Sequence, residues 1–189
     1  MGETPIVVYD ACVLYPAPLR DLLMWLAKNG LIAARWSERI LSEWVENLLL
    51  NRSDLKRERL LRTCSEMNRA IPDAMITGYE PLIETITLPD VDDRHVVATA
   101  IAAEASVILT ANLKDFPATQ LPAGIFAIAP DAFLCDLFGQ RPGEVLETMR
   151  EHRQFLRKPT KTTEEYLSTL VSNGLSSFVE LVRCHSKEL

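Results

Sequence analysis

The chain has 189 residues, of which 48% are hydrophobic, and its formal net charge at pH 7 is −6. This length and apolar content exclude a disordered chain and are sufficient to bury the core of one domain with an appendage. The negative charge excludes global attraction to nucleic acid or to an anionic membrane. Any polyanion must therefore be held by a local basic patch or by metal ions, and an RNA substrate stays compatible with the sequence.

The spacing of the cysteines and the N-terminal sequence indicate in which cellular compartment the protein is expected. Four cysteines, at positions 12, 64, 135 and 184, are scattered and form no C-x-x-C pair. This pattern favours free thiols in a reducing cytosol over a disulfide framework or a zinc site. The start MGETPI lacks the basic and apolar regions of a signal peptide, and the longest alanine and valine run, residues 96–103, is far too short for a membrane span. We therefore expect a cytoplasmic protein without a membrane segment.

Short apolar runs in chain order predict strands that are buried on both faces of a parallel sheet. They are PIVVY at 5–9, LIAA at 31–34, SVILT at 106–110 and GIFAIA at 124–129. Segments with helical periodicity lie between them, at residues 19–29, 37–50, 54–70 and 93–104. Strands that alternate with helices are joined by right-handed crossovers. The predicted fold class is therefore α/β, with a central parallel sheet covered by helices on both faces.

From Pro130 onward the pattern is helical only. Four helical segments are predicted, at residues 131–138, 142–157, 162–174 and 176–184. We expect a first domain at residues 1–130 and a C-terminal helical extension at residues 131–189. The periodic leucine and phenylalanine positions of the extension predict that it packs on the first domain or on a second subunit.

Four acidic residues come from four separate predicted elements. Asp10 ends the first strand, and Asp115 lies five residues after Thr110, where the strand SVILT ends. Asp93 opens an apolar helix, and Glu43 lies in a helix with a core-facing stripe. Because the working groups of an open α/β sheet lie beyond the carboxyl ends of its strands, one sheet edge can gather all four acids.

Each acid has a simpler interpretation when it is taken alone. Asp93 or Asp92 is a suitable helix cap, Asp115 a suitable turn residue, and Glu43 a suitable exposed side of an amphipathic helix. Asp10 is harder to explain in this way, because an unpaired carboxylate inside apolar sequence is unfavourable to bury.

Carboxylates that converge repel one another unless a cation neutralises them. Oxygen ligands without a histidine or cysteine cluster favour Mg²⁺ or Mn²⁺. Such an ion activates water and stabilises charge on a phosphodiester, so the predicted reaction class is phosphodiester hydrolysis. The glycines form neither G-x-G-x-x-G nor a Walker loop, which argues against a nucleotide cofactor, and the three histidines, at 95, 152 and 185, are isolated and more typical of surface or packing residues.

Two basic segments are candidates for contact with a phosphate backbone. Residues 52–62 contain Arg57 and Arg59, and residues 150–161 contain Arg150, Arg153, Arg157, Lys158 and Lys161. The alternative for each is a solvated helix face on which arginine and glutamate pair.

The motifs resemble a known family, the PIN domain. The resemblance is carried by Asp10 after the first strand, Glu43 in the second helix, DRHVVATA from Asp93 and TANLKDF at 110–116, and it covers roughly residues 4–130. It implies an α/β/α sandwich and a Mg²⁺- or Mn²⁺-dependent ribonuclease in which Asp10, Glu43, Asp93 and Asp115 are the metal ligands. Asn112 matches the polar residue that orients the site, and Thr110 assists it.

The same resemblance implies frequent homodimers and, in bacteria, often the toxin half of a pair that a small antitoxin holds inactive. The sequence departs from the family at Cys12, where many members have Ser, Thr or Asn, so we expect a weaker supporting hydrogen bond there. Three functions stay open: a metal-dependent endoribonuclease, a catalytically weak module that binds RNA or an antitoxin, and a metal-dependent phosphatase of small substrates.

Overall fold

The centre of the molecule is a sheet of five parallel strands in the order β3-β2-β1-β4-β5, and the computed structural model describes residues 3–157 and 159–189. The strands are β1 (Ile6–Tyr9), β2 (Ala33–Ser37), β3 (Met75–Ile76), β4 (Val107–Leu109) and β5 (Phe126–Ile128). Val8 of the central strand pairs with Arg35 on one side and with Ile108 on the other. Val7, Val8 and Tyr9 are fully buried, as expected for a strand with neighbours in its sheet and helices on both faces.

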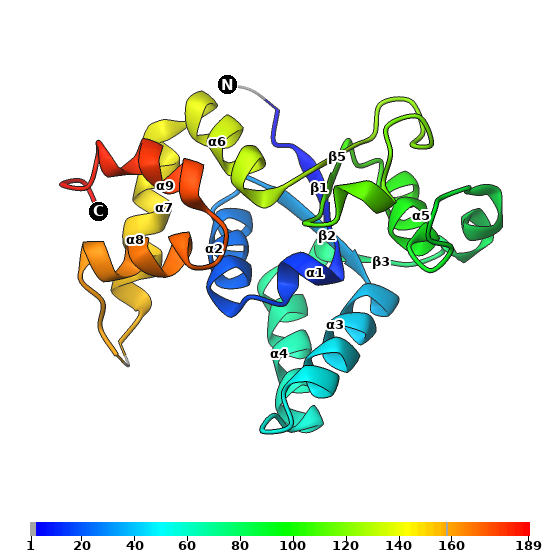
Figure 1. The fold of residues 1–189 in the computed structure, drawn as a ribbon, viewed down its shortest axis with the longest axis horizontal. Helices are drawn as coiled ribbons and strands as arrows, with labels where there is room; N and C mark the ends of the chain where they lie inside the picture. The colour runs from blue at the N-terminus through cyan, green and yellow to red at the C-terminus, as the bar shows by residue number, and fades with distance from the viewer. Residues whose placement is uncertain (1–2, 158) are drawn as a thin grey trace.

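Helices cover both faces of the sheet, which makes the architecture an α/β/α sandwich with C-terminal helices and confirms the predicted fold class. Figure 1 shows the sheet in the middle, with α2 and the C-terminal helices on one side and α5 on the other. The helices of the first part are α1 (Ala11–Leu14), α2 (Ala17–Lys28), α3 (Glu38–Asn51), α4 (Arg57–Ala70) and α5 (Arg94–Ala102), with the 3-10 turns η1 (Pro72–Ala74), η2 (Glu80–Thr85) and η3 (Leu113–Asp115).

The second strand lies later in the chain than the sequence predicted. Leu31 and Ile32 are buried but precede the strand, because the amide of Leu31 donates to the carbonyl of Leu26 and closes the end of α2. Gly30 makes this reversal possible through its positive φ of 75°. The strand extends instead to Ser37, whose hydroxyl accepts a hydrogen bond from the amide of Ile40 and caps α3.

Helix α4 begins at Arg57, three residues later than predicted. Arg52 and Asp54 form an exposed ion pair at 2.8 Å in the turn between α3 and α4, and Lys56 is the N-cap residue. The short elements α1 and β3 were not predicted, since a few residues carry too little periodicity to identify a helix or a strand.

The C-terminal part consists of α6 (Pro130–Gln140), α7 (Pro142–Phe155), α8 (Thr163–Val171) and α9 (Ser176–Arg183). The side chain of Asn29, just after α2, donates to Thr148 Oγ1 at 3.0 Å and to Glu151 Oε2 at 2.8 Å on α7. Asp131 on α6 accepts hydrogen bonds from the amides of Ser177 and Phe178 at the start of α9. The extension thus packs on α2 of the same chain, while a domain boundary at residue 130 stays a prediction.

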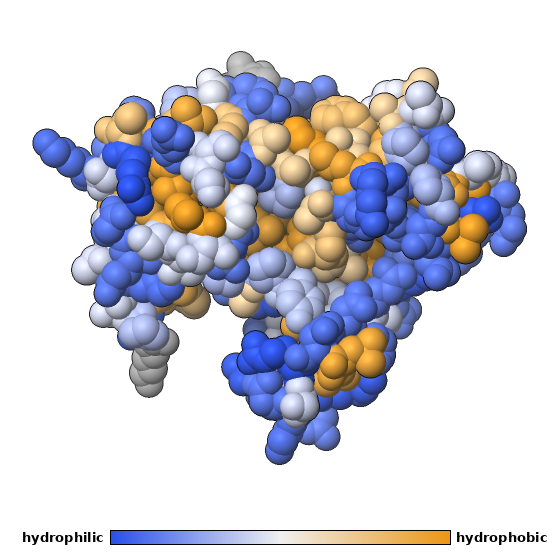
Figure 2. Space-filling view, viewed as in Figure 1, coloured by the Kyte–Doolittle hydropathy of each residue, from blue (hydrophilic) through white to orange (hydrophobic). Residues whose placement is uncertain are grey.

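The outer surface shows how apolar side chains are distributed. Figure 2 shows hydrophobic colour over the C-terminal helices and the middle of this face, whereas the α3–α4 hairpin at the bottom is mostly hydrophilic, with one hydrophobic patch. Among the described residues, no helix is both long enough and apolar enough to cross a bilayer.

Candidate functional site

Asp10 lies at the carboxyl end of the central strand. Its backbone amide donates to the carbonyl of Leu109, which joins the ends of β1 and β4. Its side chain is 7% exposed and accepts a 2.7 Å hydrogen bond at Oδ2 from the hydroxyl of Thr110, the residue that follows β4. Because β1 and β4 are parallel neighbours, both side chains reach the same edge of the sheet.

Cys12 supplies a second hydrogen bond to the same oxygen. Its Sγ donates to Asp10 Oδ2 at 3.0 Å and accepts from the amide of Ala111 at 3.2 Å. Burial, and then the nearby charge of Asp10, raise the pKa of the Cys12 thiol to about 12, so the thiol stays protonated and available as a donor. The structure therefore places a supporting hydrogen bond from Cys12 to Asp10, at the position where the sequence predicted a weaker one.

Asp93 precedes α5 at the N-cap position, but its side chain makes no capping hydrogen bond. Its pKa is raised to about 7, first by burial and then by the negative charges of Asp10, Asp90, Asp115 and Glu43. The interpretation of Asp93 as a simple helix cap is therefore not supported. The three other predicted acids all lie close enough for their charges to act on Asp93.

Asp115 and Asn112 lie together in the loop after β4. The side-chain amide of Asn112 donates to Asp115 Oδ2, and the backbone amide of Asn112 donates to Thr110 Oγ1 at 3.0 Å. This loop therefore links Asp115, through Asn112 and Thr110, to Asp10. The predicted orienting residues Asn112 and Thr110 both belong to the same network as two of the acids.

Glu43 approaches the edge from α3. Its Oε1 lies 2.7 Å from Nε2 of His95, which is fully buried on α5, and 3.6 Å from Nε of Arg39 one turn earlier on α3. Arg39 also donates to the backbone carbonyl of Asp92 at 3.4 Å. Arg39 is not among the predicted site residues, and the sequence favours a surface or packing role for His95. In the sequence, Arg39 lies four residues before Glu43, and His95 lies two residues after Asp93. These spacings are the signals that could have connected them with the acids.

The donor set of this edge is composed of carboxylate oxygens, which suit Mg²⁺ or Mn²⁺. Burial raises the pKa of Asp93, and the negative charges of the neighbouring carboxylates raise it further. Within residues 3–157 and 159–189, however, no three His, Cys, Asp or Glu side chains are grouped closely enough to form a ready metal site. The charges of Asp10, Glu43 and Asp115 thus act on Asp93, although no three of the described side chains converge closely enough to bind a metal ion.

The predicted RNA-contacting arginines lie on α4. Arg57 is bound by both oxygens of Glu46, at 2.6 and 2.9 Å, in an exposed ion pair, and Arg59 is exposed on the same helix. In the second basic segment, Arg153 donates to the carbonyls of Lys161 and Leu189. Lys158 lies outside the described residues. The pairing of Arg57 with Glu46 and the internal role of Arg153 fit the alternative of helix faces on which charges pair.

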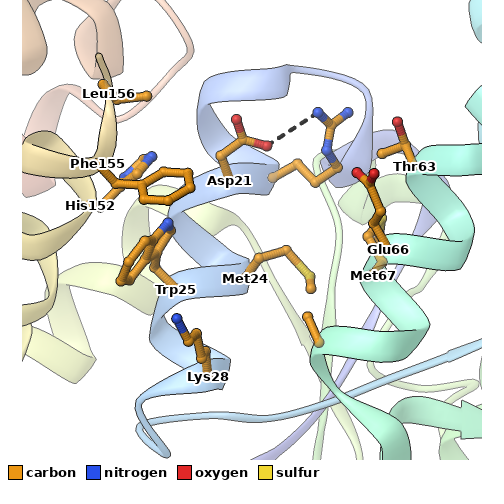
Figure 3. Close-up of a pocket in the computed structure, with 12 residues that line it drawn as sticks. Asp21, Met24, Trp25, Lys28, Thr63, Glu66, Met67, His152, Phe155 and Leu156 are labelled. Atoms are coloured by element: carbon orange, nitrogen blue, oxygen red, sulfur yellow. Dashed lines mark hydrogen bonds and ion pairs between the residues drawn. The ribbon is translucent and has the colours of Figure 1, made fainter. Parts of the chain in front are cut away.

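A separate apolar cleft of about 400 Å³ lies between α2, α4 and α7. Figure 3 shows Trp25, Met24, Phe155 and Asp21 around it. Arg20 also lines the cleft and forms an ion pair with Asp21 at 3.1 Å. None of the four acids lines this cleft.

The parallel sheet and its acidic edge define an α/β/α domain with an electronegative centre at the carboxyl ends of its strands. The chain belongs to the PIN domain family, whose profile matches residues 6–114. Residues 130–184 match the family described as VapC50 C-terminal domain.

One curated relative is the protein named "Putative ribonuclease VapC50" from Mycobacterium tuberculosis (strain ATCC 25618 / H37Rv). It is 40% identical over 83 residues, which cover 41% of this chain and 48% of the relative. The match thus spans about half of the length of that relative. No solved structure gives a significant match to the chain.

Proposed function

We propose that this chain is a Mg²⁺- or Mn²⁺-dependent endoribonuclease that hydrolyses phosphodiester bonds of RNA. The observation that carries the proposal is the placement of Asp10 at the carboxyl end of the central strand, where Thr110 and Cys12 fix its carboxylate and Asn112 links Asp115 to the same network. Membership of the PIN domain family and the relative named as a ribonuclease support the same reaction class.

In this proposal Asp10, Glu43, Asp93 and Asp115 hold the cation. When bound, the cation supplies an activated water and offsets the negative charge that develops on the phosphodiester. Thr110 and Cys12 both donate to Oδ2 of Asp10 and so fix the orientation of the carboxylate that would hold the cation. Asn112 fixes Asp115 in the same way through Oδ2.

RNA is held beside this edge by arginines of α4. Glu46, to which Arg57 is paired, lies one helical turn after Glu43 on α3, so the ion pair joins the start of α4 to the helix that carries Glu43. Arg59 is exposed on that helix, and Arg57 exchanges Glu46 for a phosphate in this proposal. Each phosphate contact releases counterions, so charge reversal of both arginines is expected to weaken RNA binding and flatten its dependence on salt. An unchanged salt slope would return both residues to a purely structural role.

The partners follow from the resemblance of the motifs to PIN-domain toxins. We propose a small antitoxin protein that holds the nuclease inactive, and a homodimer as the assembled form. We also propose that the protein acts in the cytoplasm, where a reducing environment maintains its four free cysteines.

A second candidate function is a catalytically weak module that binds RNA or an antitoxin. It is favoured by one observation: the part of the chain that the structure describes contains no ready group of three metal-binding side chains. In that case the acidic edge would bind a partner without supporting hydrolysis.

Cleavage of a fluorogenic RNA with Mg²⁺, with Mn²⁺ and with EDTA separates these functions. We expect cleavage with either metal and none with EDTA, and we expect Asp10→Asn and Asp93→Asn to lower the rate by at least about a hundredfold. Asp136→Asn, an exposed aspartate on α6, is the matched control and is expected to cleave like the parent. RNA binding without cleavage under any metal condition would favour the second candidate.

A further inference from the structure

His95 is a fully buried histidine that links two helices of the acidic edge. It is the second residue of α5, two positions after Asp93, and its Nε2 lies 2.7 Å from Oε1 of Glu43 on α3. Its helical neighbours Val96, Val97 and Ala98 are also fully buried and apolar. The imidazole is therefore a polar group in an apolar layer, directed at one acid of the edge.

Packing alone does not explain a histidine at this position. Neither ring nitrogen has a hydrogen-bond partner with good alignment among the described residues, so the 2.7 Å approach to Glu43 is a close electrostatic contact. A buried polar group without an aligned partner destabilises a fold relative to an apolar group of similar size. A leucine would fill the same space without that penalty.

The contact of Arg39 with Glu43 differs from that of His95. The Arg39 side chain is 42% exposed and its Nε is 3.6 Å from the same Oε1, so solvent and salt weaken its hold on the carboxylate. His95 is shorter in reach, buried and anchored on α5 beside Asp93. It is the group that can fix where the Glu43 carboxylate lies relative to Asp93.

We infer that His95 is a positioning residue, which orients the carboxylate of Glu43 toward the divalent cation of the acidic edge. The inference rests on the proposed function, since it assigns a role to a residue beside the proposed metal ligands. Groups that orient a metal ligand typically change metal affinity about 10- to 100-fold when they are removed. His95 acts through Glu43 and does not itself contact the substrate.

The test measures Mn²⁺ binding to the purified protein without RNA, by the loss of the electron paramagnetic resonance signal of free Mn²⁺. We expect His95→Leu to raise the Kd for Mn²⁺ by about tenfold or more, while the melting temperature in EDTA does not fall. A role in packing alone predicts the opposite, namely a lower melting temperature with unchanged Mn²⁺ affinity.

Two further variants keep the test decisive if His95→Leu does not fold. The side-chain amide of glutamine reaches about as far as Nε2 of histidine, whereas that of asparagine is one carbon shorter. We therefore expect His95→Gln to retain tighter Mn²⁺ binding than His95→Asn. His152→Leu, the same replacement at the buried histidine of α7, is the matched control and is expected to leave the Kd for Mn²⁺ unchanged.

The outcomes distinguish this inference from the proposed function. Parent protein that binds Mn²⁺ and cleaves RNA, together with His95→Leu or His95→Asn of equal Mn²⁺ affinity, overturns the inference alone. Parent protein that binds no Mn²⁺ and cleaves no RNA overturns the proposed function and this inference with it.

Discussion

Two buried polar clusters of the molecule differ in how their charges are matched. At the acidic edge, burial and then the negative charges of nearby carboxylates raise the pKa of Asp93 to about 7. Between α7 and α8, the Nδ1 of His152 forms a 3.0 Å hydrogen bond with the hydroxyl of Tyr166, and the imidazole stacks on Trp25. The second cluster is satisfied by its own members, whereas the first is not. Buried polar groups with hydrogen-bond partners stabilise the folded structure, whereas like charges that lie close together indicate a binding site.

Neutralising one acid of the acidic edge should remove its difference from the His152 cluster. This is the largest change in stability that we predict. We expect Asp93→Asn to be more stable than the parent in EDTA by roughly 1 to 2 kcal/mol after allowance for solvent screening, and so to unfold at a higher temperature. The reason is that burial disfavours the charged carboxylate of Asp93 and the nearby carboxylates repel it. Mg²⁺ at a hundredfold excess over Kd should stabilise the parent by about 2.7 kcal/mol and the variant by little. Thermal melts of both proteins across a Mg²⁺ series measure this.

An isolated capping aspartate predicts a different result. Loss of a cap destabilises by about 1 kcal/mol, and added metal would then have no effect on either protein. A variant that is less stable in EDTA yet equally responsive to Mg²⁺ would remove Asp93 from the proposed site.

Acidification should lower the stability that the His152 cluster gives the fold, and this is the second largest predicted change. Burial lowers the pKa of His152 from 6.5 to about 4, so between these values the unfolded chain binds the proton and the folded chain does not. Stability should therefore fall as the pH decreases from 6.5 toward 4, by roughly 2 kcal/mol from this group. Urea unfolding of the parent and of His152→Leu at several pH values measures the difference in slope.

The hydrogen bond to Tyr166 provides the control for this pH dependence. Tyr166→Phe removes the partner hydroxyl but keeps the buried imidazole, so its stability should still fall on acidification. Parallel pH curves for the parent and His152→Leu would show that His152 does not titrate in this range.

Substitutions of Cys12 have the smallest predicted effect, and they test how much its hydrogen bond to Asp10 contributes to the acidic edge. Cys12→Ser keeps a donor for Asp10 and should cleave RNA within about threefold of the parent, whereas Cys12→Ala should lose about three- to tenfold. Initial rates at saturating Mg²⁺ measure the difference. Equal rates for the serine and alanine variants would show that the hydrogen bond of Thr110 alone is sufficient to hold Asp10.

The central strands and the candidate acids could be predicted from local patterns in the sequence. The runs at β1, β4 and β5 are apolar and short, which is typical of strands in a buried parallel sheet, and Asp10 interrupts such a run. The role of the four acids as metal ligands stays a prediction. The raised pKa of Asp93 supports only that Asp10, Glu43 and Asp115 lie near it, after the effect of burial.

The features that were missed depend on contacts between distant segments. His95 appears as a lone histidine in an apolar helix, and only the packing of α5 near α3 brings it to Glu43. The pairing of Arg57 with Glu46 likewise depends on how α4 folds back along α3. The two-residue strand β3 forms because β2 offers it a free edge, which no local pattern reveals.

The central position of β1 in the sheet has a consequence for synthesis. The hydrogen bond from Thr110 to Asp10 joins residues that are 100 positions apart, and β4 can add to β1 only after both have left the ribosome. Such long-range pairings form late in folding, while the N-terminal part of a chain emerges first. A nascent chain that exposes only Asp10 and Glu43 cannot yet assemble the acidic edge, so the proposed site forms only after residue 115 has left the ribosome.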